Sequence, residues 1–387
     1  MLRDALGNPA DGVSYIDGGR WPDNADGAGS TLELRDPRSD NSLPESWAAS
    51  DESARRNWET ITWQGAAAAS AVGPDGQWRE FVFGLLDAGE VLIDDVSVTE
   101  NPATSAIAMI SGGNFESGTN GWRFLGNHMD ATVIPEPGNS SNHVLRLKAT
   151  GPTEHMHNHV ETTFQNSRSV VNGRTYRISF RAKWLSGSNK INARLYFNRL
   201  AKTTALTRVQ PVGTPGAANT CLAANVGPGF THLSHSPVVP EPGEPVTITA
   251  SAEDPDGVAA LTLSYSQNGG SYASVPMTAS LVAGTFTAEI PGFSAASVVR
   301  FHVSATDAAG SPATSFFPAE GASSHALYQV NDGLAAGNGL HNIRIVMDPA
   351  DKALLYQTNN LMSNGRIGCT VIYDEREVYY NAGVRLK

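Results

Sequence analysis

The chain has 387 residues, including 27 lysines and arginines and 38 aspartates and glutamates, so its formal net charge at pH 7 is −11. At roughly 150 residues per domain, this length predicts two or three domains. Charged residues form only 17% of the chain, and 38 glycines and 22 prolines favour short strands joined by turns. The absence of a basic cluster argues against a nucleic-acid partner. No apolar run approaches the roughly 18 residues of a transmembrane segment.

Residues 1–52 are rich in turns and contain one clear predicted strand, at 30–35. This strand, with Asp36-Pro37 and the segment 47–50, resembles the closing half of a bacterial lamin-tail domain. The segment 213–219 resembles the exit motif of the same family. The residues after Met1 lack the basic and apolar regions of a signal peptide. Because the chain stops within a predicted strand, we expect a longer protein and draw nothing about export from its start.

Residues 53–205 contain eight candidate strands in which apolar and polar side chains alternate, a pattern that predicts a two-sheet sandwich. The strands are expected at 58–63, 78–86, 91–98, 114–116 with 122–124, 143–149, 155–164, 176–184 and 191–197. The core is expected to contain Phe81, Phe83, Phe115, Leu145, Leu147, Ile178, Phe180, Leu195 and Phe197.

Two motifs in this region resemble a jelly-roll carbohydrate-binding module. The segment 113–116 with Trp122 is similar to the opening of that family, and 78–83 followed by 92–98 is similar to its closing strands. Here the closing motif comes first, so the region is either two incomplete modules or one circularly permuted module. Eight strands favour a single permuted jelly roll over 53–205, inserted into the lamin-tail-like unit.

The exit motif and a linker are expected over 206–236. Residues 237–330 then contain short strands at regular spacing, and Asn268-Gly269 predicts a hairpin turn between two of them. About a hundred residues of this pattern predict an immunoglobulin- or fibronectin-like sandwich.

Residues 338–387 differ in predicting a small α+β segment. A strand at 343–347 is followed by Asp348 as the cap of a short helix that starts at Pro349, and then by strands at 369–373 and 378–386. This order resembles the start of the spore-coat-H-type kinase family, with Asn381-Ala382-Gly383 where that family usually has Asn-Val-Gly. The fold class is therefore mainly β, with multidomain β-sandwiches and a small C-terminal α+β segment.

The most unusual local sequence is the histidine-rich stretch 154–161. If it is a strand, period two places His155, His157 and His159 on one face with Glu161, and turns Met156 towards the core. The outward positions of neighbouring strands are Arg177, Arg181, Asn192, Arg194 and Tyr196. Planar donors, amides and an aromatic ring suit sugar hydroxyls and C–H faces. The alternatives are a zinc site that uses two of the histidines, and an ordinary hydrated face.

The jelly-roll resemblance implies a structural calcium ion held by Asp95 and Glu116 near the meeting point of the first and last strands, since calcium prefers carboxylate and carbonyl oxygens. The segment 254–257, Asp-Pro-Asp-Gly, predicts a turn before it predicts a calcium site. Cys221 and Cys369 could pair or remain free thiols.

We expect the chain to be a non-catalytic, modular region of an exported bacterial protein that binds a glycan or cell-surface polysaccharide. No motif of a hydrolase, metalloprotease or nucleotide-binding loop occurs, and the catalytic segments of the kinase-like family are absent. An atypical kinase in the longer protein and a purely structural spacer are the alternatives. The module resemblances favour an extracellular or cell-surface location.

Overall fold

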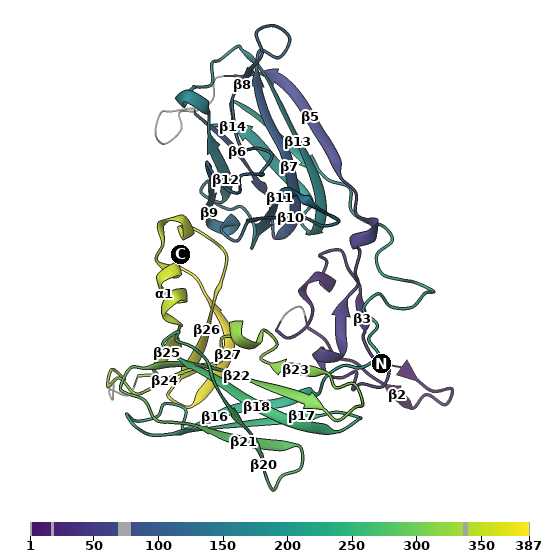
Figure 1. Ribbon diagram of the computed structural model, residues 1–387, viewed down its shortest axis with the longest axis vertical. Helices are drawn as coiled ribbons and strands as arrows, with labels where there is room; N and C mark the ends of the chain where they lie inside the picture. Colours follow the sequence, from purple (N-terminus) through teal and green to yellow (C-terminus); the bar gives the residue numbers. More distant parts are fainter. Residues whose placement is uncertain (1, 17–18, 69–78, 336–339, 387) are drawn as a thin grey trace.

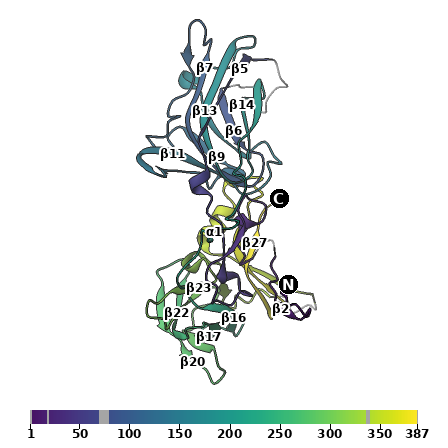
Figure 2. The same ribbon diagram turned by 90° about the vertical axis from the view of Figure 1, so that its right-hand side faces the viewer.

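The computed structural model describes residues 2–16, 19–68, 79–335 and 340–386. It confirms a mainly β protein with two sandwiches, an N-terminal segment and a small C-terminal sheet (Figure 1). The sandwiches lie at opposite ends of the long axis, with the C-terminal unit, residues 340–386, between them (Figure 2). No helix among the described residues has the length and apolarity to cross a membrane.

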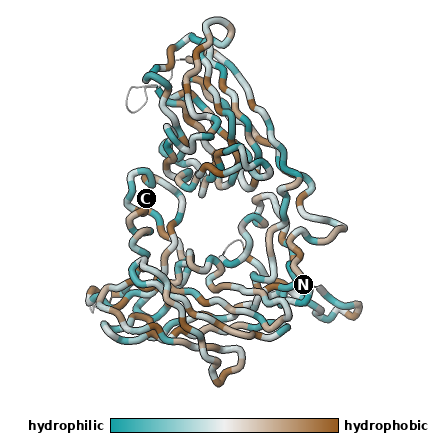
Figure 3. The backbone as a smooth tube through the Cα atoms, in the orientation of Figure 1, coloured by the Kyte–Doolittle hydropathy of each residue, from teal (hydrophilic) through white to brown (hydrophobic). Residues whose placement is uncertain are grey.

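Among the described residues, the first sandwich contains eleven antiparallel strands in two sheets. One sheet contains, in order, β10 (Thr132–Glu136), β11 (Asn139–Ala149), β7 (Gly89–Glu100), β13 (Thr175–Gly187) and β5 (Glu59–Ala66), with β8 (Ile107–Ala108) beside β7. The other sheet contains β15 (Leu200–Ala205), β14 (Lys190–Leu195), β6 (Glu80–Leu85), β12 (His159–Thr163) and β9 (Trp122–Leu125). Figure 3 shows apolar and polar positions alternating along these strands.

A single hydrophobic cluster fills the space between these two sheets and draws on both halves of the segment. It contains every residue expected in the core except Met156 and Phe197. The segments expected to open and close the module lie side by side, since the backbone N–H of Val96 donates to the Gly113 carbonyl over 2.8 Å. One sandwich therefore spans the region, and its permuted strand order stays an interpretation of this arrangement.

Several predicted strand limits are wrong. Residues 114–116 form a turn, in which Phe115 adopts a left-handed φ of 52° while its side chain remains in the core. The histidine-rich strand begins at His159 rather than His155, and the strand expected at 191–197 ends at Leu195. Strands β10 and β15 were not expected, because β10 is short and contains Pro135, and Leu200 is the one large apolar residue of β15.

The N-terminal segment pairs β1 (Leu2–Arg3) with β2 (Pro9–Asp11), and β3 (Leu32–Leu34) with β4 (Trp47–Ala49). The chain returns to it after the first sandwich. Buried Glu33 accepts hydrogen bonds from the Thr214 hydroxyl at 2.8 Å and the Thr220 amide at 2.7 Å. Buried Glu52 accepts one from the Gly213 amide at 2.7 Å. The two segments that flank the sandwich are therefore joined to each other.

The second sandwich pairs β16 (Gly229–Ser236), β17 (Val246–Glu253), β21 (Thr285–Ile290) and β20 (Thr278–Ala279) in one sheet. The other contains β19 (Ala273–Pro276), β18 (Val258–Gln267), β22 (Val298–Asp307) and β23 (Thr314–Phe317), with β24 (Leu327–Gln329) beside β22. The hairpin at Asn268-Gly269 is confirmed by the pairing of β18 with β19. Residues 229–236, expected in a linker, form the first strand because Phe230, Leu233 and His235 are buried against the core.

The C-terminal unit has the predicted order of β25 (Ile343–Val346), α1 (Pro349–Leu355), β26 (Ile367–Tyr373) and β27 (Glu377–Val384). The cap is confirmed, since Asp348 Oδ1 accepts from the Ala350 amide at 3.0 Å.

Cys221 and Cys369 are both free thiols. The 3-10 helices are η1 (Asp23–Ala25), η2 (Pro44–Ser46), η3 (Ser53–Arg55), η4 (Gly126–His128), η5 (Gln165–Ser167), η6 (Gly321–Ser323) and η7 (Thr358–Asn360).

Candidate functional site

The outward residues that we expected on one surface lie on two. Arg177 and Arg181 belong to β13, whereas Asn192 and Arg194 belong to β14 in the opposite sheet. Alternation along a strand predicts which side chains point outwards, but it does not say which sheet the strand joins. The predicted surface is therefore divided between the two outer faces of the sandwich.

A groove of about 260 Å³ lies on the outer face of the β15-β14-β6-β12-β9 sheet. Its lining consists of Glu80, Leu125, Met156, His157, His159, Glu161, Arg194, Tyr196 and Phe197. Four predicted ligand residues meet here, and two others are adjacent. The Asn192 amide oxygen accepts from Arg194 Nη1 at 2.9 Å, and the ring of His155 lies 5.0 Å from the ring of His157.

Strand register explains the charged floor of the groove. Glu161 on β12 lies opposite Arg123 on one side and Val82 on the other, and Arg194 lies opposite Val82 from β14. Neighbouring strands are about 4.8 Å apart, so the Glu161 carboxylate and the Arg194 guanidinium lie on either side of Val82. Val82 is fully buried although it points away from the core of the sandwich.

Glu161 is held as a carboxylate by two partners. Arg123 Nε donates to its Oε1 at 2.7 Å, and His159 Nε2 lies 3.1 Å from its Oε2. Burial alone would raise the pKa of Glu161, but the hydrogen bonds from His159 and Arg123 outweigh it and lower the pKa to about 2. A ligand therefore meets a fixed acceptor at this point of the groove across the physiological pH range.

One wall of the groove is a turn rather than the strand that we predicted. His155 to Asn158 form this turn, closed by a 3.0 Å hydrogen bond from the Asn158 amide to the His155 carbonyl. The expected alternation therefore fails: Met156 is 40% exposed instead of buried in the core, and His159 is only 5% exposed. Burial and the neighbouring histidines lower the pKa of His157, which favours its neutral form.

The opposite wall is aromatic. The rings of Tyr196 and Phe197 lie 5.6 Å apart at 71° to each other. Phe197 was expected in the core, but β14 ends two residues earlier and the chain turns at Asn198, which has a left-handed φ of 60°. Such a position favours asparagine, so Asn198 was the available signal that the strand had ended. Glu80, Leu125, Met156 and Phe197 were the lining residues that sequence reasoning missed.

The opposite outer face contains the other two predicted ligand residues, Arg177 and Arg181 of β13. Arg181 lies over the Trp58 ring, 4.6 Å from its centre, and its Nη1 is 3.2 Å from Asp94 Oδ2 and 3.5 Å from Asp95 Oδ2. Its guanidinium is thus engaged in contacts across the sheet. Arg177 is exposed on the same strand.

The two carboxylates implied as calcium ligands each have partners within the chain. Asp95 faces Arg181, and Glu116 accepts from the His143 amide at 2.9 Å and lies 3.0 Å from His143 Nδ1. Within the described ranges, no three His, Cys, Asp or Glu side chains gather closely enough to hold a metal ion. The calcium site stays a prediction. The segment 254–257 forms the expected turn, with the Gly257 amide donating to the Asp254 carbonyl.

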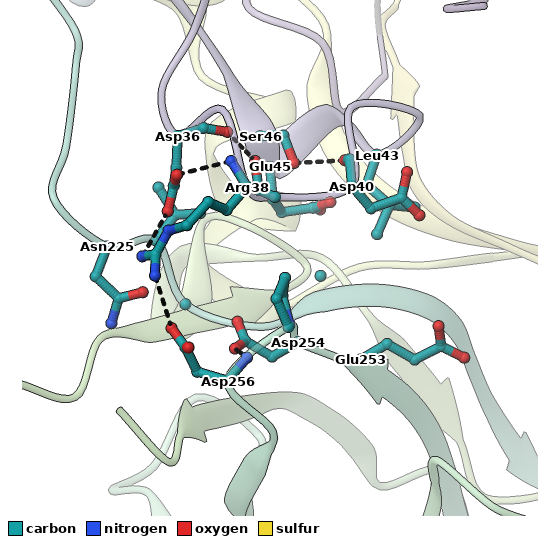
Figure 4. A pocket seen from close by; sticks show the side chains of 15 residues that line it. Asp36, Arg38, Asp40, Leu43, Glu45, Ser46, Asn225, Glu253, Asp254 and Asp256 are labelled. Atoms are coloured by element: carbon teal, nitrogen blue, oxygen red, sulfur yellow. Dashed lines mark hydrogen bonds and ion pairs between the residues drawn. The ribbon is translucent and has the colours of Figure 1, made fainter. Parts of the chain in front are cut away.

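A second hollow, of about 280 Å³, lies where the N-terminal segment meets the second sandwich (Figure 4). Carboxylates dominate its lining, with Asp36, Asp40 and Glu45 on one side and the 253–256 loop on the other. Arg38 crosses it, with Nη2 3.2 Å from Asp36 and Nη1 3.6 Å from Asp256. The described residues that line this hollow include no aromatic ring, so they link two parts of the chain and offer no stacking surface.

Comparison with known proteins distinguishes the two hollows. Residues 108–214 match the family model of a carbohydrate-binding domain. The match contains most of the groove lining, from Leu125 to Phe197, and none of the acidic hollow's carboxylates. Solved structures similar to this chain include the bromine derivative of BhCBM56, with 18% identity over 23% of this chain and 85% of that one, at a TM-score of 0.16. No curated protein matches.

Proposed function

We propose that the first sandwich binds a glycan in the groove between the 155–158 turn and Tyr196. The observation that carries this proposal is the position of the groove: most of its lining lies within the segment similar to carbohydrate-binding domains, and it combines an aromatic wall with a charged floor. Binding pockets for small ligands are typically apolar walls with a few placed polar groups.

The chemistry of the floor suits sugar hydroxyls. A hydroxyl group both donates and accepts hydrogen bonds, whereas a carboxylate only accepts and a guanidinium only donates. Glu161 and Arg194 therefore complement two hydroxyls of one ring. The rings of Tyr196 and Phe197 offer an apolar surface for the C–H face of the same sugar.

The wider role that we propose for this chain is to attach a larger protein to a glycan or surface, rather than to catalyse a reaction. The lamin-tail-like motifs of 1–52 and 213–219 and the kinase-like motif of 338–387 support a modular, exported bacterial protein in which this sandwich contacts a glycan or cell surface. An atypical kinase in a longer protein is the second candidate, favoured by the strand–helix–hairpin order of the C-terminal unit. It would use the same sandwich for targeting.

A glycan array on the full chain tests the proposal, with soluble polysaccharide titrations on any hit. Tyr196→Ala and Arg194→Ala should each lower affinity at least tenfold, because the first removes part of the aromatic wall and the second removes the guanidinium of the floor. Arg177→Ala is the matched control, since Arg177 is exposed on the other sheet. Thermal unfolding of each variant checks that the sandwich remains folded. If Arg177→Ala or Arg181→Ala abolishes binding while Tyr196→Ala does not, the ligand occupies the opposite face.

A further inference from the structure

The groove wall is attached to a part of the chain two hundred residues away. Asn158 lies between His157 and His159, both of which line the groove. Its side chain is 1% exposed and points away from the groove lining. Asn158 Oδ1 accepts a hydrogen bond from the backbone N–H of Asn127 at 3.0 Å. Asn158 Nδ2 donates to the backbone carbonyl of Met362, in the C-terminal unit, at 3.3 Å.

Asn127 forms the second half of this connection. It is fully buried, and its Nδ2 donates to the carbonyls of Gly151 at 3.1 Å and Pro152 at 2.8 Å. Its Oδ1 accepts from the Ser363 hydroxyl at 3.2 Å and from the backbone N–H of Asn364 at 2.5 Å. All four hydrogen-bonding positions of this side chain are therefore used, two of them by the C-terminal unit.

The backbone approaches closely at this point. A Cβ atom on Gly126 would lie 2.0 Å from Asn158 Oδ1, and Gly126 has a φ of +57°. Glycine is therefore required on both counts. Asn364 adds a bond from the other side, because its Nδ2 donates to the Pro152 carbonyl at 3.0 Å. Asn127, Asn158 and the 155–158 turn thus form one hydrogen-bonded assembly with residues 362–364.

We propose that the C-terminal unit completes the glycan site, with Asn127 and Asn158 as positioning residues that hold the 155–158 turn as a wall of the groove. This inference rests on the proposed function. A buried amide that loses its partner costs the desolvation of that group, so withdrawal of residues 362–364 would loosen the turn. By linkage, a glycan that needs the wall in place must also strengthen the docking of the C-terminal unit by the same factor.

The test uses the full chain with the double variant Ser363→Ala/Asn364→Ala, which leaves every groove residue unchanged. It removes the Ser363 hydroxyl that donates to Asn127 and the Asn364 side-chain amide that donates to the Pro152 carbonyl. Gln357→Ala is the matched control, an exposed amide in the same unit. Hydrogen–deuterium exchange of the unliganded protein should rise about tenfold at 156–159 in the double variant and stay unchanged in the control. Ser363→Thr, which keeps the hydroxyl, should restore protection when Asn364 is intact.

Titration with hydroxyethylcellulose, laminarin and arabinoxylan provides the second measurement. For a polysaccharide that binds the wild type, affinity should fall about fivefold or more in the double variant and not in the control. Unchanged exchange at 156–159 overturns the inference, as does raised exchange with unchanged affinity, because the wall would then lie outside the site. If none of the three binds the wild type, only the proposed function is affected, and exchange alone decides whether the C-terminal unit holds the turn.

Discussion

Replacing Glu161 with glutamine tests the electrostatic account of the groove floor. The folded pKa of about 2 lies some 2.3 units below the value of about 4.3 for an unfolded glutamate, and each unit corresponds to about 1.4 kcal/mol. The full shift would be about 3 kcal/mol. The Arg123 side chain is 43% exposed, so solvent screens its share, and we expect about 2 kcal/mol. A lowered folded pKa means that this stability is present above pH 4.3 and is lost as the pH falls towards 2.

Urea unfolding of wild type and Glu161→Gln at pH 7, 4 and 2.5 measures this effect as a difference, so titration of the other carboxylates cancels. The variant should be about 2 kcal/mol less stable at pH 7, and the gap should nearly close at pH 2.5. Glu90→Gln, which alters a carboxylate paired with exposed Arg146 on the opposite face, should cost less than about 1 kcal/mol. A gap for Glu161→Gln that is the same at all three pH values would refute the reasoning.

Four further predictions concern the fold and the untested functions. Phe180→Ala should destabilise the first sandwich by about 3–5 kcal/mol, since its ring is 3% exposed, and an equal loss from Arg181→Ala in thermal unfolding would contradict the assignment of faces. Fragments 53–101 and 102–205 should each be unfolded alone and fold together, because each supplies strands to both sheets; a cooperative transition in 102–205 alone would show otherwise. Calcium should raise the melting temperature if Asp95 and Glu116 bind it, by roughly 2.7 kcal/mol of stability at a hundredfold excess over Kd, and identical curves with calcium and chelator would exclude the site. The chain should neither hydrolyse ATP nor transfer phosphate, and autophosphorylation of 1–387 would overturn this expectation.

The apolar positions were predictable because burial depends mainly on alternation. Ile178 and Phe180 point into the core as their spacing predicts. The site was only partly predictable, because it depends on which strands become neighbours. Arg181 and Arg194 show equivalent patterns and lie on opposite faces.

Local sequence also misled where a polar residue had a distant partner. The histidine-rich stretch alternates like a strand, yet Asn158 breaks the pattern because its side chain is satisfied by Asn127 and by Met362. A partner two hundred residues away leaves no trace in a local window. The C-terminal helix was predicted well, because Asp348 and Pro349 act within one turn of it.

The hydrogen bonds of Glu33 and Glu52 to the returning chain determine how the protein would carry mechanical load. The chain leaves the N-terminal segment after Glu52 and returns to it at Gly213. The first sandwich is therefore inserted between two segments that are hydrogen-bonded to each other. Tension applied between the two ends of the chain would pass across these bonds before it reached any strand of the sandwich. A pulling force on the two ends would thus stretch other parts of the chain while the first sandwich remained folded.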